Sequence, residues 1–139
     1  MRHTRINVLV HLVWATWDRQ PLLTEPVQRS IRDSLAATCA KVGVEMIACG
    51  GIEDHLHLLV RLPANVTLAM LVQRLKGASA HLMTHEINPS AFFKWQGGYG
   101  AFSVSPRHLD AVCEYIRRQR EHHSAHTTIA AYEPGEDND

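Results

Sequence analysis

Six stretches of the sequence alternate between strand-like and helix-like patterns, and their order limits the folds open to the chain. The strand-like stretches are rich in β-branched and apolar residues, whereas the helix-like ones repeat apolar residues every three or four positions. In chain order they are strand 5–16, helix 25–41, strand 44–52, strand 55–62, helix 67–84 and strand 101–105, followed by a helix over 105–123. The order β-α-β-β-α-β predicts an α+β, ferredoxin-like or RRM-like sandwich with a largely antiparallel sheet and a C-terminal helix.

Length and composition favour one globular domain. The chain has 139 residues, of which 45% are hydrophobic and 20% charged, and this composition supports one buried core. We expect a single domain over 1–126 and an acidic, flexible tail over 127–139. The net charge is zero, but the tail holds four of the fourteen acids, which leaves ten acidic against fourteen basic residues elsewhere. This balance permits a nucleic-acid partner without requiring one.

The sequence also argues against membrane and disulfide chemistry. No apolar run approaches the roughly 20 residues that cross a bilayer, and the N-terminus has no signal-peptide pattern. Cys39, Cys49 and Cys113 are widely spaced in apolar surroundings, so we expect small buried side chains and neither a disulfide nor a zinc site. The expected location is the cytoplasm, with no membrane partner.

Two histidines, His55 and His57, interrupt an otherwise apolar strand. Side chains at positions i and i+2 of a strand project from the same face, so the two imidazoles form half of a metal site. The preceding Glu53 and Asp54 offer a carboxylate that can fix the tautomer of a ligating imidazole. With ten histidines in the chain such a pair also arises by chance. His11 is expected to be a packed core histidine.

The C-terminal helix supplies further candidates beside its apolar stripe. At about 100° per residue, His108, Tyr115, Gln119 and His122 fall within one sector of that helix. Tyr115 and Gln119 are one turn apart, and they offer a phenolic nucleophile and a carbonyl oxygen for a hard divalent ion. His108 and His122 are candidate helpers in removing the phenolic proton. Each residue taken alone also fits a structural or solvated role.

Five stretches in order resemble a known family. "DHLHLLV" (54–60) and "YIRRQ" (115–119) correspond to two signature motifs, and "HLVWATWDRQPLL" (11–23), "LKGASAHLM" (75–83) and "WQGGYGAFSVS" (95–105) agree with other parts of the same pattern. Together they resemble the single-tyrosine HUH transposases of bacterial insertion sequences, including the relatives that act on repetitive extragenic palindromes. The resemblance spans residues 6–123.

The resemblance implies a function and a site. His55, His57 and Gln119 would hold a divalent metal ion, Mg²⁺ or Mn²⁺, and Tyr115 would be the catalytic nucleophile. The implied enzyme is a metal-dependent transposase that cleaves and rejoins single-stranded DNA hairpins, at element ends or repetitive palindromes, through a 5′-phosphotyrosine intermediate. It also implies a homodimer in the bacterial cytoplasm.

Contacts to DNA and two other functions stay open at this point. Four cations are candidate phosphate contacts: Lys76, Arg117, Arg118 and Arg120. Trp95, Tyr99 and Phe102 either stack on unpaired bases or belong to the core. The chain could instead be a non-catalytic module that binds single-stranded nucleic acid through these aromatics. It could also be a metal-dependent phosphodiesterase in which water attacks and Tyr115 is structural.

Overall fold

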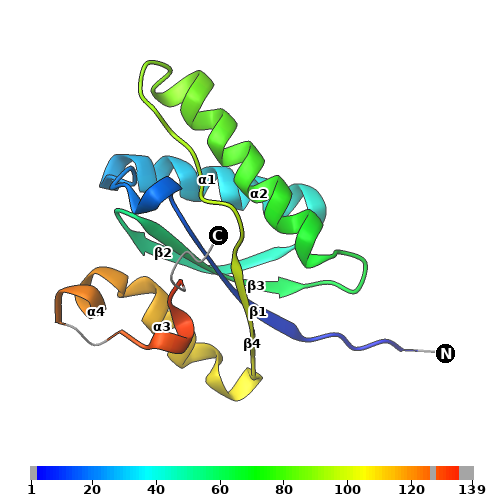
Figure 1. Cartoon of the computed structure of the whole chain (residues 1–139). Coiled ribbons are helices and arrows are strands. Elements are labelled where there is room, and N and C mark those ends of the chain that lie inside the picture. Colours follow the sequence, from blue (N-terminus) through cyan, green and yellow to red (C-terminus); the bar gives the residue numbers. More distant parts are fainter. Residues whose placement is uncertain (1–2, 126–127, 135–139) are drawn as a thin grey trace.

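The fold is built on one antiparallel sheet. The structure, a computed structural model, describes residues 3–125 and 128–134. Its strands lie in the order β2-β3-β1-β4, with every neighbouring pair antiparallel (Figure 1). Their bounds are Val8–Ala15 for β1, Glu45–Ile52 for β2, His55–Leu62 for β3 and Gly100–Val104 for β4. The strand and helix order confirms the predicted α+β ferredoxin-like sandwich.

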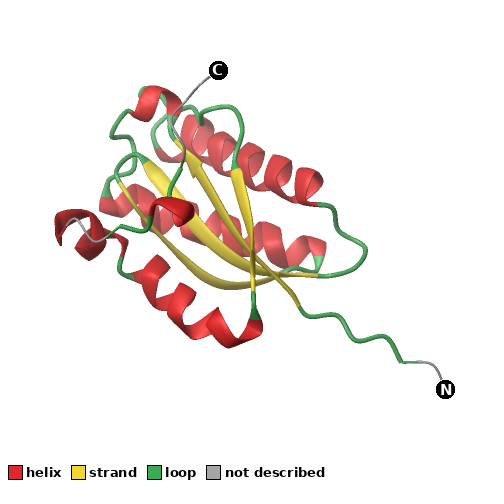
Figure 2. Cartoon of the chain, turned by 60° about the horizontal axis from the view of Figure 1, so that its bottom comes forward, coloured by secondary structure: helices red, strands yellow, loops and turns green. Residues whose placement is uncertain are grey.

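Two helices, α1 (Glu25–Val42) and α2 (Leu68–Leu82), cover one face of the sheet (Figure 2). Thr67, where the predicted helix 67–84 starts, is the N-cap of α2: its hydroxyl accepts a hydrogen bond from the backbone N–H of Met70. Gly43 ends α1 with a left-handed φ of 76°. The main core lies between these helices and the sheet and includes Leu12, Trp14, Ile31, Leu35, Leu58, Leu71 and Leu75. Among the described residues, no helix is both long and apolar enough to span a membrane.

The opposite face of the sheet carries α3 (Leu109–Arg117) and α4 (Gln119–Ala125), which lie across the sheet from α1 and α2 (Figure 1). A smaller core forms here from Ala48, Leu59, Val112, Cys113 and Ile116. The helix approaches β2 closely at Gly50, where a Cβ atom would lie 2.0 Å from the backbone oxygen of Ile116. Only glycine permits this approach without a shift of the backbone.

The predicted single C-terminal helix is divided into two in the structure. Arg118 leaves helical geometry with φ −105° and ψ 31°, and α4 begins at Gln119. The side-chain amide of Gln119 donates to the carbonyl of Tyr115 at 3.2 Å. In an uninterrupted helix that carbonyl accepts from the backbone N–H of Gln119. The side chain therefore takes over a bond of the helix where the helix is interrupted.

Part of the predicted acidic tail is described. Residues 128–134 contain a short turn, Ala130–Tyr132, which returns the chain to α3. The ring of Tyr132 packs edge-on against Tyr115, with ring centroids 5.3 Å apart. Residues 126–127 and 135–139 lie outside the described residues, so the predicted flexibility of the tail is not tested there.

Candidate functional site

His55 and His57 lie at the start of β3, on the face that carries α3 and α4. Both side chains are completely buried. His57 pairs with Gly50 of β2, and the two imidazole rings lie edge to face with centroids 5.1 Å apart. The expectation that both side chains share one face of the strand is confirmed.

Each imidazole is oriented by a hydrogen bond at its Nδ1 atom. The Nδ1 of His55 lies 2.7 Å from a carboxylate oxygen of Asp54, and the Nδ1 of His57 lies 2.8 Å from Nε2 of His11. Burial alone would lower the pKa of His55, but the bonds to Asp54 and Glu133 outweigh it and raise that pKa. Burial lowers the pKa of His57, and it lowers the pKa of His11 to about 4. With their Nδ1 atoms bonded in this way, His55 and His57 direct their Nε2 atoms into the same space.

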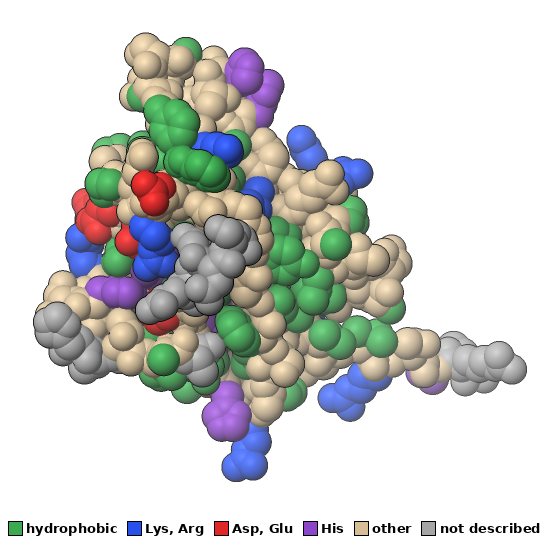
Figure 3. Space-filling view, in the orientation of Figure 1, with side chains coloured by type: hydrophobic (Ala, Val, Ile, Leu, Met, Phe, Trp, Pro, Cys, Tyr) green, Lys and Arg blue, Asp and Glu red, His purple; other side chains and the backbone are tan. Residues whose placement is uncertain are grey.

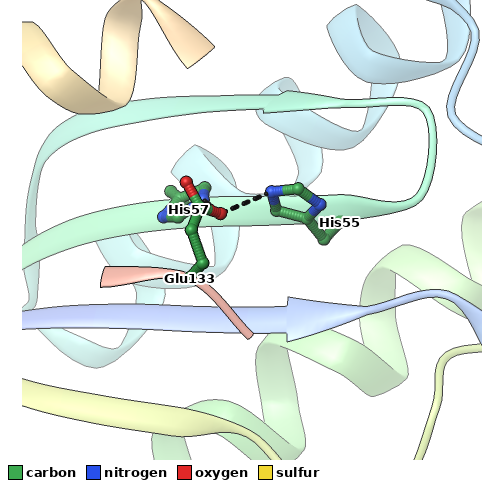
Figure 4. A group of neighbouring side chains, drawn as sticks. All are labelled: His55, His57 and Glu133. Carbon is green, nitrogen blue, oxygen red and sulfur yellow. Dashed lines mark hydrogen bonds and ion pairs between the residues drawn. The ribbon is translucent and has the colours of Figure 1, made fainter. Parts of the chain in front are cut away.

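Glu133, which the sequence analysis did not identify, lies in that space beside both rings (Figure 4). Its Oε2 atom is 2.9 Å from Nε2 of His55 and 3.1 Å from Nε2 of His57. The three side chains place their ligand atoms within 4.8 Å of one another, as a metal site requires. No sequence pattern links Glu133 to the histidines, because the contact spans 76 positions of the chain.

Gln119 adds a fourth donor atom to the group. Its side chain is only 1% exposed, and its Oε1 lies 3.3 Å from Nε2 of His55. Neighbouring ligands of an octahedral ion are about 3 Å apart when each is about 2.1 Å from the metal. The spacing of these nitrogen and oxygen donors is therefore that of the ligands of a divalent metal ion.

Tyr115 lies against the same group and is nearly covered. The residue is only 4% exposed. Its hydroxyl donates to Oε1 of Glu133 and accepts a hydrogen bond of 2.8 Å from the backbone N–H of Ile129. The ring of His122 stacks on it with centroids 4.6 Å apart. His108, the other candidate helper, instead contacts the Ser105 hydroxyl at 3.1 Å.

The protonation of Tyr115 and Glu133 follows from these contacts. Burial, reinforced by the bond to Glu133, raises the pKa of Tyr115 to about 12. Burial alone would raise the pKa of Glu133, but hydrogen bonds from His55, His57 and Tyr115 outweigh it and hold that pKa far below its usual range. The group thus contains a protonated phenol beside an ionised carboxylate.

The predicted phosphate contacts lie in different surroundings. Arg117 and Arg120 line a groove of about 610 Å³ along β2, together with Arg32. Arg120 pairs with Glu53 at 2.8 Å. Two further cations are already engaged: Arg118 with Glu121 at 2.6 Å, and Lys76 with the carbonyls of Gln96 and Gly98. The face drawn in Figure 3 mixes basic, acidic and hydrophobic side chains, in keeping with the zero net charge.

The three aromatic candidates divide between core and surface. Trp95 is 6% exposed, packs edge-on against Trp14 and donates its indole N–H to the Ser79 hydroxyl at 3.0 Å. Tyr99 and Phe102 remain exposed at 42% and 37%. Trp95 is therefore a core residue. Of the three, only Tyr99 and Phe102 are exposed enough to stack on bases in this conformation.

Comparisons with known proteins agree on one family. The family model described as "Transposase IS200 like" matches residues 4–119. The transposase for insertion sequence element IS200 of Salmonella typhimurium is 26% identical over 141 residues, which cover 97% of this chain and 91% of that protein. The ISDra2 transposase TnpA of Deinococcus radiodurans is 29% identical over 117 residues, covering 80% of this chain and 83% of that protein.

Two solved structures share the fold. A crystal structure from Deinococcus radiodurans R1, described as a transposase, superposes with a TM-score of 0.68 at 27% identity and covers 84% of this chain and 95% of its own. A REP-associated tyrosine transposase bound to a REP hairpin gives the same TM-score at 13% identity, covering the whole of this chain and 92% of its own.

Proposed function

The chain belongs to the IS200-like transposase family, and we propose that it cleaves and rejoins single-stranded DNA, with Tyr115 as nucleophile and a divalent metal ion held by His55, His57 and Gln119. One observation carries the proposal: the carboxylate of Glu133 contacts both imidazole Nε2 atoms and the Tyr115 hydroxyl. A DNA phosphate is also an anion with several acceptor oxygens. The position of this carboxylate therefore suits the scissile phosphate, beside the nucleophile and the metal ligands.

The proposed reaction exchanges one phosphodiester for another. The Tyr115 oxygen bonds to phosphorus while the bond to the 3′-oxygen breaks, which leaves a 5′-phosphotyrosine and a 3′-hydroxyl. The phenolic proton of Tyr115 passes to water, and the departing 3′-oxygen takes a proton from water, so that no net proton is gained or lost. A bound Mg²⁺ or Mn²⁺ would neutralise developing phosphate charge. Because a phosphodiester is retained, a 3′-hydroxyl can reverse the step and reseal DNA in a new arrangement without ATP.

The covered state of Tyr115 adds a requirement. Its side chain is 4% exposed under residues 128–134, and Glu133 fills the space that the phosphate needs. In this proposal the DNA displaces Glu133, so a phosphate oxygen takes the place of a carboxylate oxygen. The segment 128–134 therefore moves away from α3 before cleavage.

The proposed substrate is a single-stranded DNA hairpin at element ends or repetitive palindromes. A relative's structure holds a REP hairpin, which supports this choice of substrate class. The groove lined by Arg32, Arg117 and Arg120 offers phosphate contacts for the strand beside α3. A homodimer is part of the same proposal.

A covalent-adduct assay tests this function. The full chain is incubated with end-labelled hairpin DNA, with and without Mn²⁺, beside Tyr115→Phe and His57→Ala, and separated on a denaturing gel. We expect an adduct that needs Mn²⁺ and is lost in both variants. Free cleavage products from Tyr115→Phe would instead support attack by water, and metal-independent binding without cleavage of any target would support a binding module.

A further inference from the structure

His11 is a completely buried polar residue whose ring makes one hydrogen bond. Its Nε2 lies 2.8 Å from Nδ1 of His57, across the pairing of β1 and β3. Its Nδ1 is buried without a hydrogen-bond partner among the described residues. Two aromatic rings also lie near it, those of Phe102 and Tyr132, at centroid distances of 6.1 and 5.5 Å.

Packing alone does not account for an imidazole at this position. A buried polar atom without a partner lowers the stability of the fold, and an apolar ring of similar size would avoid that cost. The single bonded nitrogen of His11 is directed at His57, whose other nitrogen faces Glu133 and the proposed metal. The placement of the polar atom therefore points to the site.

We infer that His11 is a positioning residue for the metal site: its Nε2 orients the ring of His57, and it can accept the Nδ1 proton of His57, which leaves Nε2 of His57 free for a metal ion. The inference rests on the proposed metal position at His55 and His57. A metal bound at Nε2 of His57 needs a lone pair there, so the ring proton must be on Nδ1 and be accepted by Nε2 of His11.

The opposite arrangement holds when Glu133 occupies the site. The Glu133 carboxylate only accepts, so His57 donates through Nε2 at 3.1 Å, and its Nδ1 then accepts the Nε2 proton of His11. With a metal ion on Nε2 of His57, that nitrogen would carry no proton. The Nε2 proton of His57 would leave to solvent, the Nε2 proton of His11 would pass to Nδ1 of His57, and His11 would take up a proton on its own Nδ1. Two protons remain on the pair throughout. A neutral imidazole at position 11 suits both states because either of its ring nitrogens can carry the proton while the other accepts.

The test measures Mn²⁺ binding to the full chain by calorimetry, without DNA. His11→Phe keeps a ring but has no acceptor, whereas His11→Gln keeps an amide that donates or accepts. We expect Phe to weaken Mn²⁺ binding by about tenfold or more and Gln to restore it to within about threefold of the wild type. Ser79→Ala is the matched control, because it removes a buried acceptor on the other face of the sheet and should leave Mn²⁺ affinity unchanged.

Three results separate the possible failures. Equal Mn²⁺ affinity in the wild type and His11→Phe would overturn the inference while leaving the metal site intact. Equal affinity in the wild type and His57→Ala would overturn the metal site and the inference together. If His11→Phe does not fold, nitrogen NMR of the wild type decides: we expect the ring proton of His57 on Nε2 without metal and on Nδ1 with Zn²⁺. A proton that does not change atoms would overturn the inference.

Discussion

Replacement of Gly50 by alanine tests whether the site depends on the close approach of α3 to the sheet. A Cβ atom at Gly50 would lie 2.0 Å from the backbone oxygen of Ile116, whereas real Cβ contacts essentially never fall below 3.0 Å. The helix must therefore retreat by at least 1.0 Å, since both atoms belong to the backbone or are fixed to it. Ile116 directly follows Tyr115, and Gly50 pairs with His57. The shift thus separates nucleophile and metal ligands.

The expected effect on activity exceeds the effect on stability. Overpacking of this kind costs about 1–3 kcal/mol of unfolding free energy, and a misplacement of about 1 Å can slow a reaction by roughly 100-fold. We expect Gly50→Ala to remain folded and to form the covalent adduct about 100-fold more slowly. Gly77→Ala in α2 is the control: nothing lies within 4 Å of its added Cβ, so the adduct rate should be unchanged and stability should rise by about 0.5–1 kcal/mol.

Single-turnover adduct formation on denaturing gels gives the rates, and urea unfolding gives the stabilities. A Gly50→Ala protein that reacts at the wild-type rate would refute the reasoning, because it would mean that the position of α3 against β2 does not set the distance between Tyr115 and the histidines.

Three further predictions follow from the same geometry. Glu133→Ala should form the adduct several-fold faster than the wild type, because the phosphate no longer has to displace a carboxylate; a slower reaction would contradict the displacement step. In EDTA, His11 should contribute a fall of about 3 kcal/mol in the unfolding free energy as pH drops from 6.5 to 4, because burial lowers its pKa to about 4 and the unfolded chain therefore binds the proton first. Urea titrations should show a smaller fall in His11→Phe, and an equal fall would be evidence against a neutral buried His11. Arg117→Ala should weaken binding of single-stranded DNA and lower the slope of log K against log salt by about 0.7, the value for one lost phosphate contact; an unchanged slope in a filter-binding series would remove Arg117 from the DNA path.

Local periodicity explains why much of the architecture and part of the site were predictable. The period of two in β3 places His55 and His57 on one face, and the helical spacing of Tyr115 and Gln119 survives the break at Arg118 because the side chain of Gln119 bonds to the Tyr115 carbonyl. The break itself has no glycine or proline to mark it.

The remaining parts of the site depend on contacts between distant positions of the chain. Glu133 reaches His57 across 76 positions and His11 reaches it across 46, so no local pattern indicates either contact. His11 was predicted to be a core residue because its neighbours in the sequence are apolar. The structure confirms its burial, and it also shows a hydrogen bond from His11 to His57 of the site. The acidic residues of the tail were visible in the sequence, but nothing in the sequence indicated that Glu133 would lie beside His55 and His57.

The most direct test of the central claim is to identify the residue that carries the DNA. The adduct formed with Mn²⁺ is digested with nuclease and trypsin and examined by mass spectrometry. The three tyrosines of the chain, Tyr99, Tyr115 and Tyr132, fall in three different tryptic peptides. The account predicts a nucleotide attached to peptide 108–117, which contains Tyr115. A nucleotide on either other peptide, or no nucleotide on any tyrosine despite cleavage of the DNA, would contradict it.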